Sequence, residues 1–364
     1  MWLIIFGISI AAVIAGLIYM MSALSKFPGI QKISKGRKLI GWPVSFLIIA
    51  AGLVIMGYFT SPINAAVAFL NLILFMLIFA LIAKIIKKRS DKFYWQGWLP
   101  IIACAIYLGI ACFLCVNVWK TDYTLSTDKE LGTLRAAVFA DSHLGTTFDG
   151  EGFEKHLQDI QSQNPDILLI PGDFVDDGTS KEDMIKACEA LGNFSCKYGV
   201  YFSYGNHDRG YYRNSESEFM EENLIRELEK NGVHILKDEY ELIDDRFYIV
   251  GREDASVKDR MSAEELIGSI SDKDKYIIVM DHQPNDYANE AATDADLVLS
   301  GHTHGGQMIP ITYVGVLFGI NDRTYGYENR EGTDFIVTSG ISDWEIVFKS
   351  GTKSEYLLIT INGK

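Results

Sequence analysis

Long uninterrupted apolar runs dominate the first third of the chain. Four runs contain no Asp, Glu, Lys or Arg, and they cover residues 2–21, 39–58, 62–83 and 98–119. A run of about 20 apolar residues is long enough to cross a bilayer as a helix. Trp2, Trp42, Trp98 and Trp119 lie at or near the ends of these runs, where interfacial aromatic residues gather. The pattern predicts an all-α transmembrane domain of four helices over residues 1–120. Buried core helices are the alternative.

Beyond residue 133 the pattern changes to short apolar runs that alternate with amphipathic segments. We predict helices at residues 153–163, 181–191, 217–231 and 263–270. We predict strands at residues 134–140, 166–170, 200–204, 233–236, 240–243, 247–250, 276–280, 296–299, 335–338 and 355–361. This alternation predicts an α/β domain over residues 134–364. The polar segment 121–133 is predicted to be a linker.

Charge separates the two parts of the chain. Residues 1–125 carry a net charge of +9 and the remainder −23, which gives −14 for the whole chain. Lys and Arg cluster after the first apolar run, at residues 26–38, and after the third, at residues 84–92. Positively charged loops stay in the cytoplasm. We therefore expect a multi-pass protein of the cytoplasmic membrane whose soluble domain is extracytoplasmic. That location permits a disulfide between Cys188 and Cys196, and two unpaired thiols are the alternative.

Metal-binding side chains concentrate just after predicted strands. The chain has seven histidines, and five of them fall at such positions together with Asp and Asn. In α/β folds, ligands gather outside the carboxyl ends of strands. Imidazole, carboxylate and amide groups without a thiolate suit Mn, Fe or Zn. The candidate residues are Asp141, His143, Asp173, Asn206, His207, His282, His302 and His304.

These segments resemble the calcineurin-like metallophosphoesterase superfamily over about residues 134–362. The family pattern is D-x-H, G-D, G-N-H-D, a later His and G-H-x-H, and the chain matches each element. The run GHTHGGQ, followed by Pro310, resembles the membrane-associated bacterial phosphodiesterase branch. That branch has an Arg-rich turn before the last strand, whereas this chain has Lys349 and no Arg there. The resemblance implies a four-layer αββα sandwich with a dinuclear metal site.

The resemblance also implies roles for individual residues. One metal ion would be held by Asp141, His143, Asp173 and His304. The second would be held by Asp173, Asn206, His282 and His302, so that Asp173 bridges the two. A metal-bridging hydroxide would be the nucleophile. His207 would donate a proton to the leaving group or stabilise charge on the phosphate, and Asp208 would orient it. Arg209 and Gln307 are candidates for substrate contacts.

The predicted function is hydrolysis of a phosphate ester, a phosphodiester in particular, at the outer face of the membrane. Two divalent metal ions (Mn, Fe or Zn) are the expected cofactors. A phosphomonoester or a lipid-linked phosphate is an alternative substrate, and a non-catalytic metal-binding sensor or scaffold is an alternative function. The net charge of −23 beyond residue 125 argues against nucleic acid as the substrate. The sequence leaves the oligomeric state open.

Overall fold

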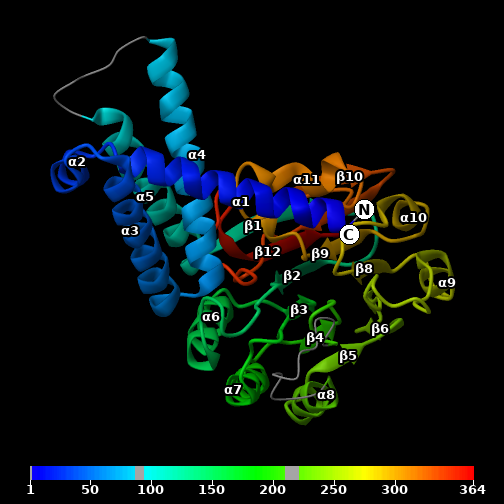
Figure 1. Cartoon of the computed structure of the whole chain (residues 1–364). Helices are drawn as coiled ribbons and strands as arrows, with labels where there is room; N and C mark the ends of the chain where they lie inside the picture. The colour runs from blue at the N-terminus through cyan, green and yellow to red at the C-terminus, as the bar shows by residue number, and fades with distance from the viewer. Residues whose placement is uncertain (1, 87–93, 210–220) are drawn as a thin grey trace. The chain divides into compact units, whose positions relative to one another are not determined.

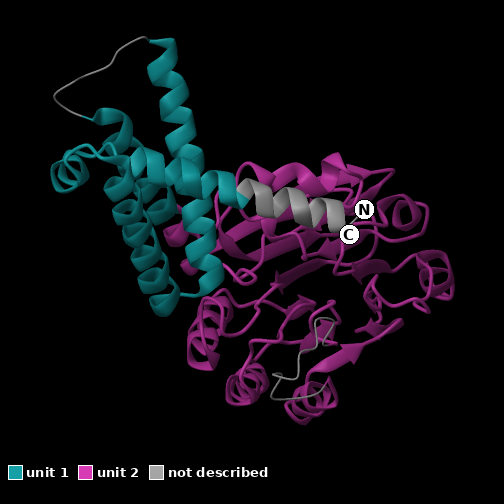
Figure 2. Ribbon diagram, viewed as in Figure 1, with its two compact units in different colours: residues 1–110 teal, residues 111–364 magenta. Residues whose placement is uncertain are grey.

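The chain divides into two compact units in a computed structural model that describes residues 2–86, 94–209 and 221–364, with side chains from residue 13 onward. Unit 1 comprises residues 1–110 and unit 2 residues 111–364 (Figure 2). The division falls before the predicted domain boundary at residue 120, because the last turn of helix α5 packs within unit 2.

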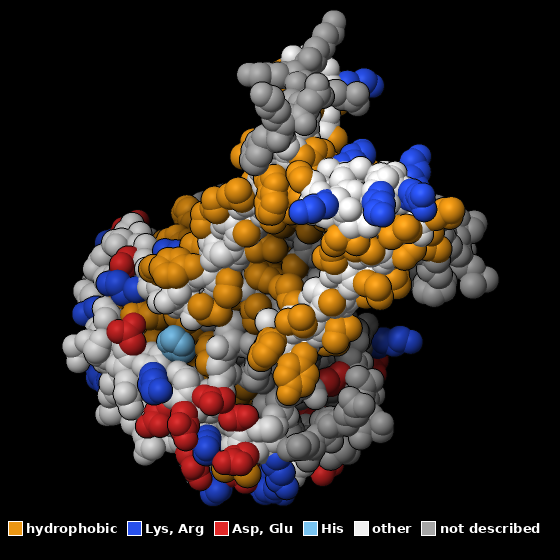
Figure 3. All heavy atoms as spheres, turned by 60° about the vertical axis from the view of Figure 1, so that its left-hand side comes forward, with side chains coloured by type: hydrophobic (Ala, Val, Ile, Leu, Met, Phe, Trp, Pro, Cys, Tyr) orange, Lys and Arg blue, Asp and Glu red, His pale blue; other side chains and the backbone are white. Residues whose placement is uncertain are grey.

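Unit 1 is built from apolar helices. They are α1 (Trp2–Leu24), α2 (Pro28–Ser34), α3 (Lys38–Phe59), α4 (Pro62–Ile85) and α5 (Trp95–Val116), the last of which continues into unit 2. In the described part of the chain, α3, α4 and α5 are long and apolar enough to cross a membrane. A fourth candidate is a pair, residues Val13–Leu24 and Pro28–Ser34, bent by 84°. Hydrophobic side chains cover much of the surface of these helices (Figure 3), as expected for helices that face lipid rather than water.

Unit 2 contains two six-stranded sheets (Figure 1). The first has the order β1-β12-β2-β3-β4-β5, and the second has the order β10-β11-β9-β8-β7-β6. The strands of the first sheet are β1 (Val118–Ser126), β12 (Ser354–Asn362), β2 (Thr133–Val138), β3 (Ile167–Pro171), β4 (Val200–Ser203) and β5 (His234–Leu236). Those of the second are β10 (Gly326–Arg330), β11 (Thr333–Val337), β9 (Leu297–Ser300), β8 (Tyr276–Met280), β7 (Phe247–Gly251) and β6 (Glu239–Ile243).

The sheets and helices form the four layers that the sequence predicted. Alternate residues of both sheets, among them Val138, Leu169, Ile278 and Leu299, pack into one buried core between the sheets. Helices α6 (Gly150–Ser162), α7 (Lys181–Gly192) and α8 (Glu221–Lys230) bury their apolar faces on the other side of the first sheet. Helices α9 (Ala263–Gly268) and α10 (Tyr287–Ala291) cover the second sheet. Parallel strands β2, β3 and β4 end at one edge of their sheet, as do β8 and β9 of the other.

The segment predicted as a linker, residues 121–133, is largely not a linker. Residues Val118–Ser126 form β1, which pairs in parallel with β12 along nine residues. Exposed Lys120 and Asp122 alternate with Tyr123 and Leu125, which contribute to the core between the sheets. The polar half of this alternation hides the strand from a search for apolar runs. The fourth apolar helix ends at Val116 and does not reach residue 119, because Val118 and Trp119 belong to β1.

Three further details complete the comparison with the predicted elements. Strand β10 and helices α2, α10 and α11 (Val314–Leu317) were not predicted. The start of the predicted helix over residues 217–231 lies outside the described residues, which begin again at α8. Cys188 and Cys196 are both free, so the second alternative holds for this pair.

Candidate metal centre

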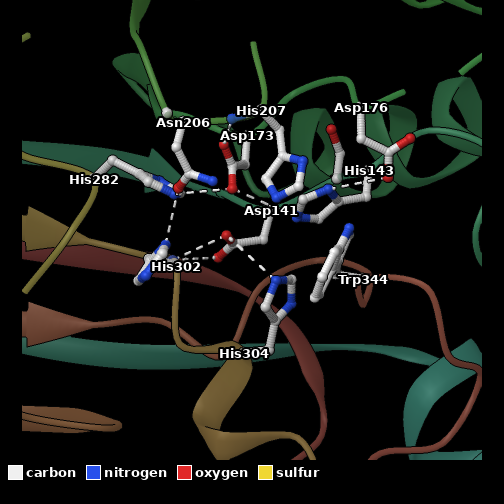
Figure 4. A network of polar contacts seen from close by, with 12 residues as sticks. Asp141, His143, Asp173, Asp176, Asn206, His207, His282, His302, His304 and Trp344 are labelled. Carbon is white, nitrogen blue, oxygen red and sulfur yellow. Dashed lines mark hydrogen bonds and ion pairs between the residues drawn. The ribbon is translucent and has the colours of Figure 1, made fainter. Parts of the chain in front are cut away.

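The predicted site residues follow five strands that end at the same edge of the two sheets. Asp141 and His143 follow β2, and Asp173 follows β3. Asn206 and His207 follow β4, His282 follows β8, and His302 and His304 follow β9. Figure 4 shows these side chains pointing toward one another from both sheets. The fold thus brings together all seven residues that were predicted to hold metal ions.

The ligand atoms lie close enough to share cations. Asp141, His143 and His304 form one group whose ligand atoms all lie within 4.8 Å of one another, and Asp173, His282 and His302 form a second such group. The Oδ2 atom of Asp173 is 3.0 Å from His282 Nε2 and 3.6 Å from His143 Nε2. It therefore lies between the two groups, where the bridging carboxylate was predicted.

Two further residues border these groups. The amide oxygen of Asn206 lies 3.0 Å from His302 Nδ1, which places it beside the second group. His207 forms a third group with His143 and Asp173. Geometry alone therefore admits His207 as a ligand as well as a residue that faces substrate.

The backbone at the centre is held in an uncommon conformation. Asp141, His143, Asp173, His302 and His304 all have φ between 34° and 68°. Only a few per cent of non-glycine residues adopt positive φ. Such conformations persist where the surrounding structure imposes them, often at functional sites. Five of the seven predicted ligands share this feature, so the loops are shaped to aim side chains inward.

Two loops approach each other closely at Gly205, the glycine of the G-N-H-D motif, and this explains why a glycine is required there. A Cβ atom on Gly205 would lie 2.2 Å from Asp173 Oδ1 and 2.4 Å from the backbone nitrogen of Asp173. Real Cβ atoms do not come so near to other heavy atoms, so a side chain at residue 205 would push the central carboxylate away. The glycine in the motif is therefore a geometric requirement for placing Asp173.

Burial and neighbouring charges shift the pKa values of the central residues in opposite directions. Burial opposes ionisation of Asp173, but the imidazoles of His282 and His143 hold the pKa of its carboxyl below the usual range. Burial alone would lower the pKa of His143, yet the carboxylates of Asp176, Asp173 and Asp141 raise it to about 9. Burial, strengthened by nearby imidazoles, lowers the pKa of His207 to about 4. Acidic and basic groups thus stabilise one another at the centre, and His207 stays neutral near pH 7.

The residues fit a pair of divalent cations. The buried nitrogens His143 Nε2 and His282 Nε2 make no hydrogen bond of acceptable geometry among the described residues, although each lies near Asp173. A buried polar atom without a hydrogen-bond partner is costly. A cation coordinated between each imidazole and the shared carboxylate would satisfy both nitrogens and remove that cost. Nitrogen and oxygen ligands without sulfur suit Mn, Fe or Zn.

Three outer partners orient the imidazoles. Asp176 Oδ2 lies 3.3 Å from His143 Nδ1, and Asp343 Oδ1 lies 3.2 Å from His304 Nδ1. The carbonyl oxygen of Pro171 lies 2.9 Å from His282 Nδ1. Partners of this kind fix the ring and the nitrogen that faces a metal ion. Sequence reasoning did not identify them: Asp176 lies three residues after Asp173 and was a detectable candidate, whereas nothing in the sequence near Asp343 marks it.

Asp208 holds two loops together, which differs from the predicted role of orienting His207. Its Oδ2 accepts hydrogen bonds from the backbone N–H groups of Asp173 and Gly205, both at 2.8 Å. Its Oδ1 accepts from Phe174 at 2.8 Å and Val175 at 3.1 Å. All four bonds fix the loops after β3 and β4, so Asp208 positions Asp173 through the backbone.

Replacing Asp208 with Asn is therefore expected to destabilise the fold. The amide NH₂ group would face two backbone donors and leave them buried without an acceptor, at about 1–3 kcal/mol each. We expect unfolding of the full chain in detergent to shift down by roughly 5–10 °C in calorimetry. Asp128→Asn, at a side chain that is 97% exposed, is the matched control and should leave the transition unchanged. An unaltered transition in Asp208→Asn would contradict this role.

Arg209 and Gln307, the two predicted substrate contacts, have different surroundings in the structure. Both the Nε and NH2 atoms of Arg209 donate to Glu253, and its guanidinium stacks over Tyr204. Arg209 is thus committed to an ion pair, and its hydrogen bonds do not support a substrate contact. Gln307 lines the cavity at the metal centre, but its Nε2 donates to Asp343 Oδ1 and to the carbonyl oxygen of Trp344. Trp344 itself packs near His207, with ring centroids 5.4 Å apart.

Lys349 has a structural position in the turn where the resemblance had an Arg-rich segment. It is fully buried, and its Nζ donates to the backbone carbonyls of Ser339 and Ser342 at 2.5 and 2.9 Å. It also lies 4.0 Å from Asp343 Oδ2. Lys349 therefore supports the turn that carries Asp343.

Several known proteins are similar to this chain. Residues 134–306 match the family model of calcineurin-like phosphoesterases. An uncharacterized metallophosphoesterase of Campylobacter jejuni is 28% identical over 73% of this chain and 70% of its own length. A Danio rerio transmembrane protein with a metallophosphoesterase domain is 29% identical over 72% of this chain and 62% of its own length. A solved dimetal phosphatase of Danio rerio has a TM-score of 0.36 at 12% identity, over 60% of this chain and 88% of that one.

Proposed function

We propose that residues 134–306, which match the calcineurin-like phosphoesterase model, belong to a metal-dependent phosphoester hydrolase domain and that this domain hydrolyses phosphodiesters at a dinuclear centre. One observation carries the proposal. The carboxylate of Asp173 belongs to one group of candidate ligands, with His282 and His302, and lies 3.6 Å from His143 of the other group. A shared carboxylate is what holds two cations about 3.5–4 Å apart in two-metal sites.

Each metal ion would have its own set of ligands. Asp141, His143 and His304 would bind the first, and Asn206, His282 and His302 the second, with Asp173 common to both. The cations would supply Lewis acidity toward the phosphate and lower the pKa of water to near neutrality. The chain's own contribution is orientation: Asp176, Asp343 and the carbonyl of Pro171 fix three of the imidazoles. Net hydrolysis adds one water and gives an alcohol and a phosphomonoester.

His207 is proposed to face the leaving group. It lines the cavity beside Asp173 and Trp344 and is 8% exposed. An N–H of its imidazole would donate a hydrogen bond to the departing oxygen or to a phosphate oxygen. With a poor leaving group the proton would come from the imidazolium form, which the lowered pKa of about 4 makes the minor form near pH 7, and the neutral imidazole would remain. A residue placed in this way contributes about 10²–10⁴-fold to proton-transfer steps.

Turnover of an aryl phosphodiester tests the proposed activity. The full chain in detergent, stripped with a chelator and reloaded with Mn²⁺, should cleave bis(p-nitrophenyl) phosphate, and renewed chelation should abolish cleavage. The monoester p-nitrophenyl phosphate should be the poorer substrate by kcat/KM. Preparations that bind two equivalents of Mn²⁺, Zn²⁺ or Fe²⁺ but hydrolyse neither ester would contradict the proposal and favour a binding function.

We also propose that the chain crosses the cytoplasmic membrane several times and exposes its phosphoesterase domain on the extracytoplasmic side. Support comes from the apolar helices and from Lys26, Lys32, Lys35, Arg37 and Lys38, which lie on one side of the predicted topology. The second basic cluster lies outside the described residues apart from Lys84. Protease added to intact protoplasts should remove the domain, whereas a domain that is cleaved only after lysis would reverse the orientation.

A further inference from the structure

A segment at the mouth of the metal-site cavity exposes an unusual amount of apolar surface. Residues 309–320, here called the rim segment, contain no charged side chain. Leu317, Phe318 and Tyr313 are 78, 73 and 72% exposed. The other exposed apolar side chains of the segment are Ile309, Ile311, Val314, Val316 and Ile320. Contiguous apolar patches of this kind on a folded domain mark sites of protein or membrane interaction.

The rim segment is anchored to the metal loop rather than loosely attached. A Cβ on Gly306 would lie 2.3 Å from the carbonyl oxygen of Thr312, so the segment lies directly against the loop that carries His304. The Thr324 hydroxyl also donates to that carbonyl at 3.3 Å. At the start of the segment, the backbone N–H of Ile309 donates to Ser350 Oγ at 3.0 Å. The apolar side chains are therefore presented outward from a fixed base.

That base is joined to the last turn of α5. The backbone N–H of Lys349 donates to the carbonyl of Ala111 at 3.0 Å, and Ser354 Oγ donates to the carbonyl of Cys115 at 2.6 Å. Both acceptors belong to a helix that is long and apolar enough to cross a membrane and that ends at Val116. Where such a helix ends, the bilayer interface begins. With α5 across a bilayer, residues 349–354 and the rim segment bonded to them would lie at the level of that interface.

We propose that the rim segment inserts into the interfacial layer of the bilayer in which α5 is embedded. Its composition fits this occupant. Tyr313 and Phe318 are aromatic residues of the kind that settle at the headgroup level, and Leu317 and Ile320 would reach the acyl boundary. An apolar surface without charge binds lipid through its buried area alone. If a second copy of the chain covered the rim segment instead, the segment would not need to lie beside the end of an apolar helix such as α5.

The position of the rim segment has a consequence for the substrate that deepens the proposed function and rests on it. The cavity, of about 280 Å³, is lined by Ile311, Thr312 and Gly315 of the rim segment as well as by Asp173, His302 and His304. A molecule that fills it would place phosphate at the ligand groups and an apolar portion along the rim segment. The substrate class is therefore phosphodiesters that carry an acyl or alkyl chain and reside in the bilayer.

Depth-dependent fluorescence quenching tests the insertion without any substrate. Leu317→Trp in the full chain is reconstituted into phosphatidylcholine bilayers with and without brominated acyl chains. Leu242→Trp is the matched control, because Leu242 lies on β6 and is 41% exposed. The added tryptophan at residue 317 should be quenched roughly twofold more than the one at residue 242, as expected for a side chain buried at the acyl boundary. Both variants keep the native tryptophans as a common background.

Equal quenching of the two variants would overturn the insertion. So would a blue shift of the residue 317 variant in detergent that grows with protein concentration, since this would indicate a second copy as the occupant. Neither readout needs hydrolysis, so the insertion can stand if the proposed activity fails. With active protein, Leu317→Asp should reduce hydrolysis of hexadecyl p-nitrophenyl phosphate in phosphatidylcholine vesicles about tenfold more than that of bis(p-nitrophenyl) phosphate. Equal losses would overturn the substrate class alone.

Discussion

Asp173→Asn is expected to abolish metal binding at both positions and with it nearly all hydrolysis. The Oδ2 atom of Asp173 is 3.0 Å from His282 Nε2, in its own candidate ligand group, and 3.6 Å from His143 Nε2, which belongs to the other group. An amide has one coordinating oxygen and no charge, and its NH₂ group cannot bind a cation. Two metal ions contribute several kcal/mol to transition-state stabilisation. A loss of this size lowers kcat/KM by about three orders of magnitude.

Metal content is the decisive measurement for this variant. Elemental analysis of the chelated and reloaded protein should give close to two equivalents of Mn²⁺ for the parent and for Asp128→Asn, whose carboxylate lies in solvent. The Asp173 variant should retain less than one. Its fold should persist, because the backbone N–H of Asp173 still donates to Asp208. A variant that keeps two equivalents and loses only turnover would show that Asp173 acts on substrate and does not bridge.

Regular elements with strong patterns were predictable from the sequence, and those with mixed patterns were not. Strand β8 was predicted with its observed bounds because all five of its residues are buried. Strand β1 was missed because it is an edge strand whose exposed Lys120 and Asp122 interrupt the apolar signal. Helix α11 was missed for a different reason. Its apolar residues are exposed, whereas periodicity detects helices by their buried side.

The residues of the candidate site also differ in whether the sequence predicts their roles. Its inner residues were predictable because each follows a strand and carries a metal-binding group. The outer residues were not, because their roles depend on contacts between distant segments: Asp343 meets His304 from the turn before β12. Asp208 and Arg209 show the reverse error. Asp208 was predicted to orient His207 and Arg209 to contact substrate, but their hydrogen bonds reach Phe174 and Glu253, which lie elsewhere in the chain.

Asp343 connects the candidate metal centre to the end of α5. Its Oδ1 lies beside His304 and accepts from Gln307, and its Oδ2 lies 4.0 Å from the thiol of Cys115. One carboxylate thus contacts a predicted metal ligand, a residue at the cavity and the last turn of α5. The loop that orients His304 is therefore fixed by the same helix end that sets the level of the rim segment. The end of α5 therefore contacts the residues that support the site.

His207→Ala is expected to slow hydrolysis while both metal ions remain bound. This variant distinguishes two possible roles of His207, at the leaving group or as a metal ligand. The second role is possible because His207 forms a group with His143 and Asp173 that could hold a cation. If His207 serves the leaving group, the loss should be about 10²–10⁴-fold for an alkyl leaving group. It should be much smaller for p-nitrophenolate, which departs without a proton. A loss of equal size for both leaving groups would assign His207 to stabilising charge on the phosphate.

The chain provides a matched control for this experiment. His234 lies on β5 away from the metal centre, with its imidazole 3.2 Å from Glu241 and stacked on Tyr201. His234→Ala removes the same side chain and should leave kcat, KM and metal content unchanged. Because the variants differ only in where the imidazole is lost, a rate loss confined to His207→Ala reports on the site. If His207→Ala instead loses one equivalent of metal, His207 is a ligand, and the proton must reach the leaving oxygen from another group.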